Sequence, residues 1–82
     1  MKIGIEITAA DDPGVLHQLT GVIARRDGNI RSIQIVEQTG GDTRIYFEVE
    51  LPAEPEALIA KLGALSVVRH AAKVETMEQP LQ

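Results

Sequence analysis

The strictest pattern in this chain is a two-residue alternation of apolar and polar side chains, which occurs twice. Residues 2–8 place three isoleucines on one face and polar residues or glycine on the other. Residues 44–51 repeat this pattern with larger apolar side chains, and Pro52 ends it. Because successive side chains of a strand point to opposite faces of a sheet, both segments are predicted to be strands with one buried and one solvated face.

Two other segments have the apolar spacing of helices that bury one face. We expect Asp12 to cap the first of these helices, Pro13 to occupy its first turn and Gly28 to end it. The second helix is predicted to begin at about Pro55, with three leucines at helical spacing and acidic residues near its N-terminus. The predicted buried face of the first helix consists of Val15, Leu16, Leu19, Val22 and Ile23.

Two further strands complete the prediction. Residues 29–38 are rich in isoleucine, but the isoleucines change phase, which predicts a β-bulge near Arg31 or Ser32. Residues 39–42, with two central glycines, are typical of a hairpin turn. Residues 67–75 are predicted to form the last strand, in which Val68, Ala72 and Val74 share one face.

The predicted order of elements is βαββαβ, which defines an α+β fold of the ferredoxin-like type. Because crossover connections are right-handed, both helices are expected on one face of a four-stranded antiparallel sheet with strand order 4-1-3-2. The result is a two-layer sandwich. We assign residues 1–76 to this single domain and expect residues 77–82 to form a flexible C-terminal tail.

Composition and charge exclude several classes of function. The chain has 82 residues, no cysteine and a formal net charge of −4, so thiolate metal sites are excluded and a sequence-independent grip on nucleic acid is disfavoured. Residues 1–12 lack the apolar core of a signal peptide, and no apolar run reaches the ~20 residues needed to span a bilayer. We therefore expect a soluble cytoplasmic protein with neither a nucleic-acid nor a membrane partner.

Candidate catalytic residues are few. The two histidines, His17 and His70, lie on separate elements, and no serine has the strand-turn-helix setting of a nucleophile elbow. Base stacking on the open sheet face would need aromatic side chains, and Tyr46 is the single candidate in the sequence. We predict no catalytic residues, no metal site and no cofactor.

The start of the first helix is the segment best suited to hold a ligand. Gly14 lacks a Cβ atom, so the backbone N–H groups of the helix N-terminus are open to a carboxylate, while Asp11 offers acceptors to an ammonium group. Asn29 follows the other end of the same helix, too far away to close the site within one chain. A two-fold dimer that pairs the second strand with its own copy would bring the two ends together.

At these residues the chain resembles the ACT domain family. The motif Asp-x-Pro-Gly-Val-Leu occupies residues 11–16, and Asn-Ile follows at residues 29–30, with Asn29 fifteen residues after Gly14. The resemblance extends over residues 3 to about 75. It implies a regulatory module of amino-acid metabolism that binds a small-molecule effector, with an amino acid expected, and controls an associated or fused enzyme. Asp11 stands where members that bind a polar amino acid often have Asn. The implied ligand-binding residues are Asp11, Asp12, Pro13, Gly14, Val15, Asn29 and Ile30.

A line of small residues on the back of the first helix indicates where a homodimer forms. A glycine inside a helix costs about 1 kcal/mol relative to alanine, and close approach of a partner helix would explain Gly21. The predicted dimer interface comprises His17, Gly21, Ala24, Ile33 and Ile35. Two hypotheses stay open: a module that reports an amino acid to an enzyme, and a dimerisation or protein-interaction module that holds no ligand.

Overall fold

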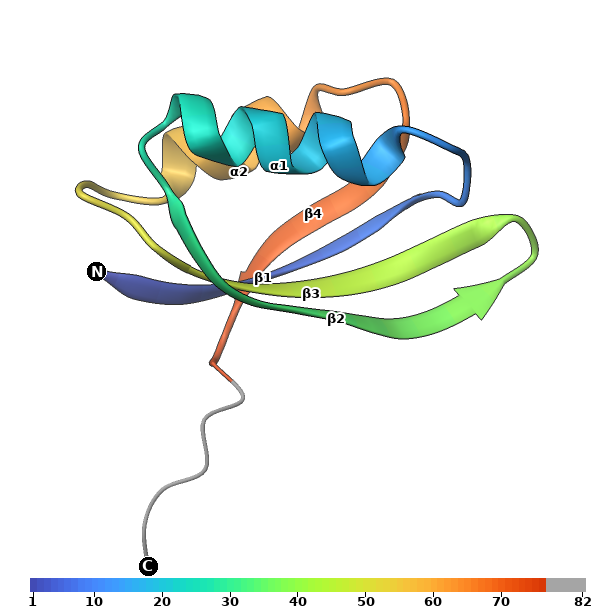
Figure 1. The fold of residues 1–82 in the computed structure, drawn as a ribbon, viewed down its shortest axis with the longest axis horizontal. Helices are drawn as coiled ribbons and strands as arrows, with labels where there is room; N and C mark the ends of the chain where they lie inside the picture. Colours follow the sequence, from blue (N-terminus) through green and yellow to red (C-terminus); the bar gives the residue numbers. More distant parts are fainter. Residues whose placement is uncertain (77–82) are drawn as a thin grey trace, which may run out of the picture.

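The sheet is built around strand β1 (Lys2–Ala10), which lies beneath two helices (Figure 1). The three isoleucines of β1 are buried. The computed structural model describes residues 1–76, and the predicted tail 77–82 lies outside the described residues. Helix α1 (Val15–Arg25) and helix α2 (Glu56–Gly63) cover one face of the sheet. The remaining strands are β2 (Asn29–Thr39), β3 (Asp42–Glu50) and β4 (Val68–Val74).

The sheet has the order β2-β3-β1-β4 and is antiparallel throughout, which confirms the predicted fold. β1 and β3 form its centre, where Ile5 lies opposite Phe47 and Ile7 lies opposite Ile45. All four of these side chains are buried, together with Leu19 and Ile23 of α1 and Leu58 and Leu62 of α2. β2 and β4 are the two edge strands.

Helix α1 begins later than predicted. Gly14, not Asp12, is the N-cap residue, and no side chain caps the helix. Pro13 lies in the turn before the first helical residue, Val15, instead of in the first turn of the helix. Leu16, predicted to be buried, is exposed, whereas the other four apolar residues of the predicted face are buried.

The C-terminus of α1 shows why a glycine occupies position 28. The residue with left-handed backbone geometry is Asp27, at φ 60°, so Gly28 does not end the helix in the predicted way. The N–H of Gly28 donates to the carbonyl of Ile23 at 2.9 Å. A Cβ atom at Gly28 would lie 2.6 Å from Cγ2 of Ile23 and 3.2 Å from Cδ2 of Leu51, so the close approach of the chain after α1 to these two side chains requires glycine here.

Bulges shape both edge strands. The bulge predicted near Arg31 or Ser32 is confirmed by a register shift between Ile30 and Ser32, and a second shift lies between Ile35 and Glu37. The predicted hairpin turn is also confirmed, with φ 60° at Gly40 and 84° at Gly41, values that favour glycine at both central positions.

The predicted phase of β4 was wrong because of another bulge. Val68 pairs with Ala9, but the next pair joins His70 to Thr8, so one extra residue enters β4 at this point. Beyond the bulge, Ala71 pairs with Ile7 and packs against the core. Ala72, predicted to share a face with Val68, therefore lies on the opposite face of the sheet.

We predict that Gly28→Ala lowers the free energy of unfolding by about 1–3 kcal/mol, because its methyl group would overlap a buried side chain. The matched control is Gly63→Ala at the end of α2, where a Cβ atom would meet nothing within 4 Å. Helix propensity there favours alanine by up to about 1 kcal/mol. Urea denaturation of both variants tests this, and equal stabilities would contradict the packing described at Gly28.

Candidate functional site

The loop between β1 and α1 is fixed to the tip of the β2–β3 hairpin. The backbone N–H of Asp11 donates a hydrogen bond to the carbonyl of Gly41 at 2.9 Å. Since Ala10 pairs with Asp42, this bond continues the β1–β3 ladder by one residue beyond the strands. The hairpin turn thus sets the position from which the Asp11 side chain projects.

Gln38 provides a second link between this loop and the hairpin. Its Nε2 donates to Oδ2 of Asp11 at 3.4 Å, and both side chains are exposed. Gln38 was not among the residues predicted for the site. The signal that could have identified it is topological, because the hairpin turn and the β1–α1 loop must lie at the same end of an antiparallel sheet.

The N-terminus of α1 presents unpaired backbone donors. Within the described residues, the N–H groups of Gly14, Leu16 and His17 have no backbone acceptor, whereas that of Val15 donates to the carbonyl of Asp12 at 3.3 Å. The macrodipole of the helix adds partial positive charge at this end, which favours a carboxylate or another anion. Gly14 has φ 85°, and a Cβ atom there would meet nothing within 4 Å.

The other predicted loop residues have different settings. Asp12 and Pro13 are exposed in the turn that precedes the helix. The side chain of Val15 is 3% exposed and belongs to the hydrophobic core, so it is turned away from the solvent at the loop.

Asn29 and Ile30 lie at the opposite end of the molecule. Asn29 pairs with Glu50 at one end of β3, while Asp11 meets the hairpin at the other end. At roughly 3.3 Å per residue in a strand, the length of β3 separates these ends by about 26 Å. As predicted, one chain does not bring the two halves of the site together, and Figure 1 shows the β1–α1 loop and the start of β2 at opposite ends of α1.

The predicted interface residues lie on the side of the sheet that carries the two helices, in a part that is not covered. Ile33 and Ile35 pair with Phe47 and Ile45, so they point to the same face as the core, yet they are 40% and 59% exposed. On α1, His17 and Ala24 are exposed, and Gly21 is half-buried. A Cβ atom at Gly21 would approach only Nη1 of Arg25, at 3.7 Å, so packing within the chain does not require glycine there.

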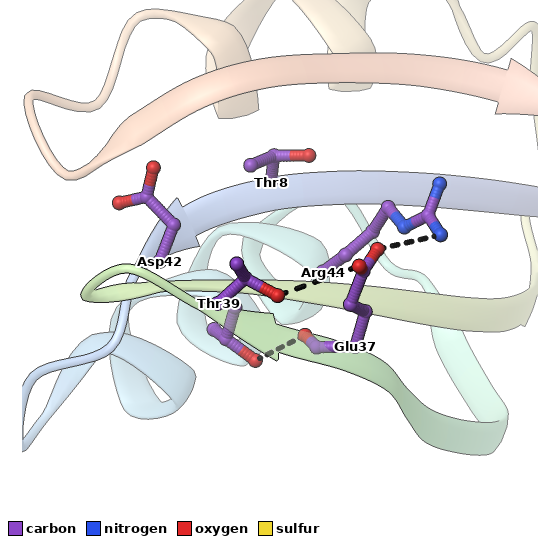
Figure 2. A pocket seen from close by; sticks show the side chains of 6 residues that line it. Thr8, Glu37, Thr39, Asp42 and Arg44 are labelled. Carbon is purple, nitrogen blue, oxygen red and sulfur yellow. Dashed lines mark hydrogen bonds and ion pairs between the residues drawn. The ribbon is translucent and has the colours of Figure 1, made fainter.

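A shallow pocket of about 240 Å³ opens near the hairpin, and none of the predicted site residues lines it. Figure 2 shows Glu37 and Arg44 facing one another there, with Nη2 of Arg44 3.0 Å from Oε1 of Glu37. Asp42 at its rim pairs with Nε of Arg69 at 3.4 Å. The pocket's charges are thus already paired within the chain. Its full lining is Thr8, Glu37, Thr39, Asp42, Thr43 and Arg44.

The described residues offer little for metal or acid–base chemistry. His17 and His70 are both exposed and lie on different elements, α1 and β4. No group of three or more histidine, aspartate or glutamate side chains in residues 1–76 is arranged to hold a metal ion. None of the helices in this part of the chain is long and apolar enough to cross a membrane.

The architecture and the exposed glycine loop define a βαββαβ domain of the ferredoxin-like class. Residues 5–70 match the family model described as the AHAS small subunit-like ACT domain. The chain therefore belongs to the ACT family, whose domains are generally regulatory, ligand-binding modules without catalytic function of their own.

A protein of Methanocaldococcus jannaschii, described as uncharacterized, is 37% identical over 70 residues, or 84% of this chain. The chain spans 32% of that relative's length. Among solved structures, the ACT domain from GTP pyrophosphokinase of Chlorobium tepidum is 26% identical, with a TM-score of 0.74 over 90% of this chain and 97% of that one.

A homoserine dehydrogenase from Thiobacillus denitrificans is similar in fold. Its TM-score is 0.69 at 23% identity, and the match covers 90% of this chain and 17% of that chain. The solved structures therefore include a domain of this shape within a larger chain.

We predict that Gly14→Ala lowers the free energy of unfolding by about 1–2 kcal/mol, although nothing obstructs its methyl group. The reason is the left-handed backbone at φ 85°, where a Cβ atom approaches its own carbonyl. Gly14→Asn is the control, because asparagine tolerates this conformation better than alanine. Urea titration should rank wild type above Asn and Asn above Ala, and an alanine variant as stable as wild type would contradict the strained geometry.

Proposed function

We propose that this chain is a homodimeric regulatory module that binds an amino acid between its subunits and controls an associated or fused metabolic enzyme. The observation that carries the proposal is the pair of complementary half-sites at opposite ends of α1. One half-site, at Gly14 and Asp11, presents unpaired N–H groups beside a carboxylate. The other half-site, at Asn29 and Ile30, presents an exposed amide beside an apolar side chain.

The chemistry of the first half-site suits the two charged groups of an α-amino acid. A carboxylate would be stabilised by the N–H groups at the start of α1, and an ammonium group would be stabilised by the Asp11 carboxylate. The Asp11 N–H bond to Gly41 holds the loop in place before any ligand arrives, so less conformational entropy is lost on binding.

The dimer is supported by the uncovered apolar surface of β2. An exposed edge strand with isoleucine side chains is prone to pair with another chain, and a second copy of the same strand satisfies both its hydrogen bonds and its apolar surface. Such pairing joins two four-stranded sheets into one and places the two α1 helices side by side. We further propose a cytoplasmic location, where metabolic enzymes would be available as partners.

A ligand-free dimerisation module is the competing function, and the exposed isoleucines alone would serve it. Thermal-shift measurements against the twenty amino acids separate the two. A ligand at 100 times its dissociation constant should add about 2.7 kcal/mol of stability. Asp11→Asn should then weaken binding of the active amino acid by roughly ten-fold or more, as expected for a charged hydrogen bond. If no amino acid raises the melting temperature, the sensing function is wrong and the dimerisation module remains.

We predict that Gly21→Leu shifts the chain from dimer to monomer at micromolar concentration, because a leucine at the helix crossing would push the two α1 helices apart. The same change should not destabilise the monomer, since leucine favours helix over glycine and space is open around Gly21 within the chain.

The matched control is Ala57→Leu on the exposed face of α2, which is remote from the proposed interface and should leave the dimer unchanged. Sedimentation velocity reads out both variants. A monomeric wild type, or a Gly21→Leu variant that stays dimeric, would contradict this interface.

A further inference from the structure

The two bulges of β2 restrict how it can pair with a second copy of itself. They lie between Ile30 and Ser32 and between Ile35 and Glu37, so the regular part of the edge runs over residues 32–35. Bulges disrupt regular pairing, and the dimer must therefore use this short segment as the centre of its ladder.

Symmetry narrows the choice of register. Residues directly opposite each other in an antiparallel pair point to the same face of the sheet. In a dimer whose two-fold axis is perpendicular to the sheet, one residue of β2 must therefore lie directly opposite its own copy. An axis at Ile33 would place Ile35 opposite the partner's Arg31. An axis at Gln34 places Ile33 opposite the partner's Ile35 on the helical face.

The axis at Gln34 is favoured over the axis at Ile33 because it places exposed apolar side chains opposite one another. It pairs both exposed isoleucines of one subunit with those of the other, and apolar cross-strand pairs stabilise a sheet, whereas isoleucine opposite arginine leaves a charge at the seam. The same axis leaves Ile33 and Ile35 on the side of the sheet where the α1 helices lie.

This register determines what reaches Asp11 from the other subunit. Gln38 follows Gln34 by four residues and Ile30 precedes it by four, and each of these two intervals contains one bulge, so the two counts stay matched. Gln38 of one subunit then lies opposite Ile30 of the partner subunit and beside the partner's Asn29. Gln38 is also the residue whose Nε2 donates to Oδ2 of Asp11. One side chain therefore connects the two half-sites.

We propose that Gln38 is a positioning residue of the ligand site, and that it orients the Asp11 carboxylate toward the ligand in a dimer centred on Gln34. This role rests on the proposed function. With Oδ2 held by Gln38 and the backbone held by Gly41, Oδ1 of Asp11 is the oxygen left for an ammonium group. The partner's Asn29 and Ile30 then close the site from the other side of Gln38.

The register is tested without any ligand. The chain has no native cysteine, so a single introduced one reports its own neighbourhood. Gln34→Cys should form a disulfide-linked dimer on mild oxidation, because directly opposed strand residues have Cα atoms about 4.5–5.5 Å apart. Ser32→Cys, on the same strand and face, should not cross-link, since its copy would be four residues away, at about 13 Å. Efficient cross-linking at position 32 and not at 34 would overturn the register.

The positioning role is tested by calorimetry with the amino acid that gives the largest thermal shift. Gln38→Ala should weaken its binding by about 3- to 10-fold, the effect of one hydrogen bond. In an Asp11→Asn background the same change should have little further effect, because the carboxylate to be positioned is gone. The control is Thr39→Ala, which removes the polar side chain next to Gln38, whose hydroxyl donates to Glu37 and not to Asp11, with the dimer checked by sedimentation.

The outcomes separate this inference from the proposed function. If wild type binds and Gln38→Ala binds equally well, Gln38 has no positioning role while the proposed function stands. Additive losses from Gln38→Ala and Asp11→Asn would also overturn the role. If wild type binds no amino acid, the proposed function fails and the role of Gln38 fails with it, whereas the cross-linking result still decides the register.

Discussion

The length of helix α1 is the constraint on which the rest of the molecule depends. The helix crosses the sheet from the hairpin end to the far end, so its N-terminal donors and the Asn29–Ile30 pair face opposite ends of β3. No rearrangement of side chains can bridge a gap of about 26 Å along a strand. A small ligand that needs both groups therefore needs two subunits, and the exposed isoleucines of β2 offer the surface on which a second subunit can pack.

Local periodicity made much of this fold predictable from the sequence. Three sequence patterns predicted elements that the structure contains. They are the alternation of apolar and polar residues around Ile5 and Phe47, the helical spacing around Leu19 and the two glycines of the hairpin turn. The bulge near Arg31 was also predictable, because apolar residues that change phase within one strand can share a face only if an extra residue is inserted between them. The strand order followed from the handedness of the crossovers.

Features that depend on tertiary contacts were not predictable in the same way. The apolar residues of β4 do not change phase in the sequence, so the bulge in this strand could not be predicted from them. Because of the bulge, Ala71 and not Ala72 packs against the core. Asp12 has the side chain of a good N-cap, but the left-handed turn at Gly14 starts the helix two residues later. The contact from Gln38 to Asp11 joins residues far apart in sequence, and it exists only because the hairpin tip meets the β1–α1 loop.

Subunit complementation tests the central claim, that each ligand site is shared by two chains. Asp11→Asn and Asn29→Ala homodimers should both bind the active amino acid weakly, because each carries one damaged half in every site. Unfolding and refolding them together at equal concentration produces mixed dimers, in which both lesions fall into one site and the other site is intact. Calorimetry of the mixture should then show wild-type affinity in about a quarter of all sites, as random pairing requires. A mixture in which no wild-type sites reappear, although sedimentation shows dimers, would contradict the shared site.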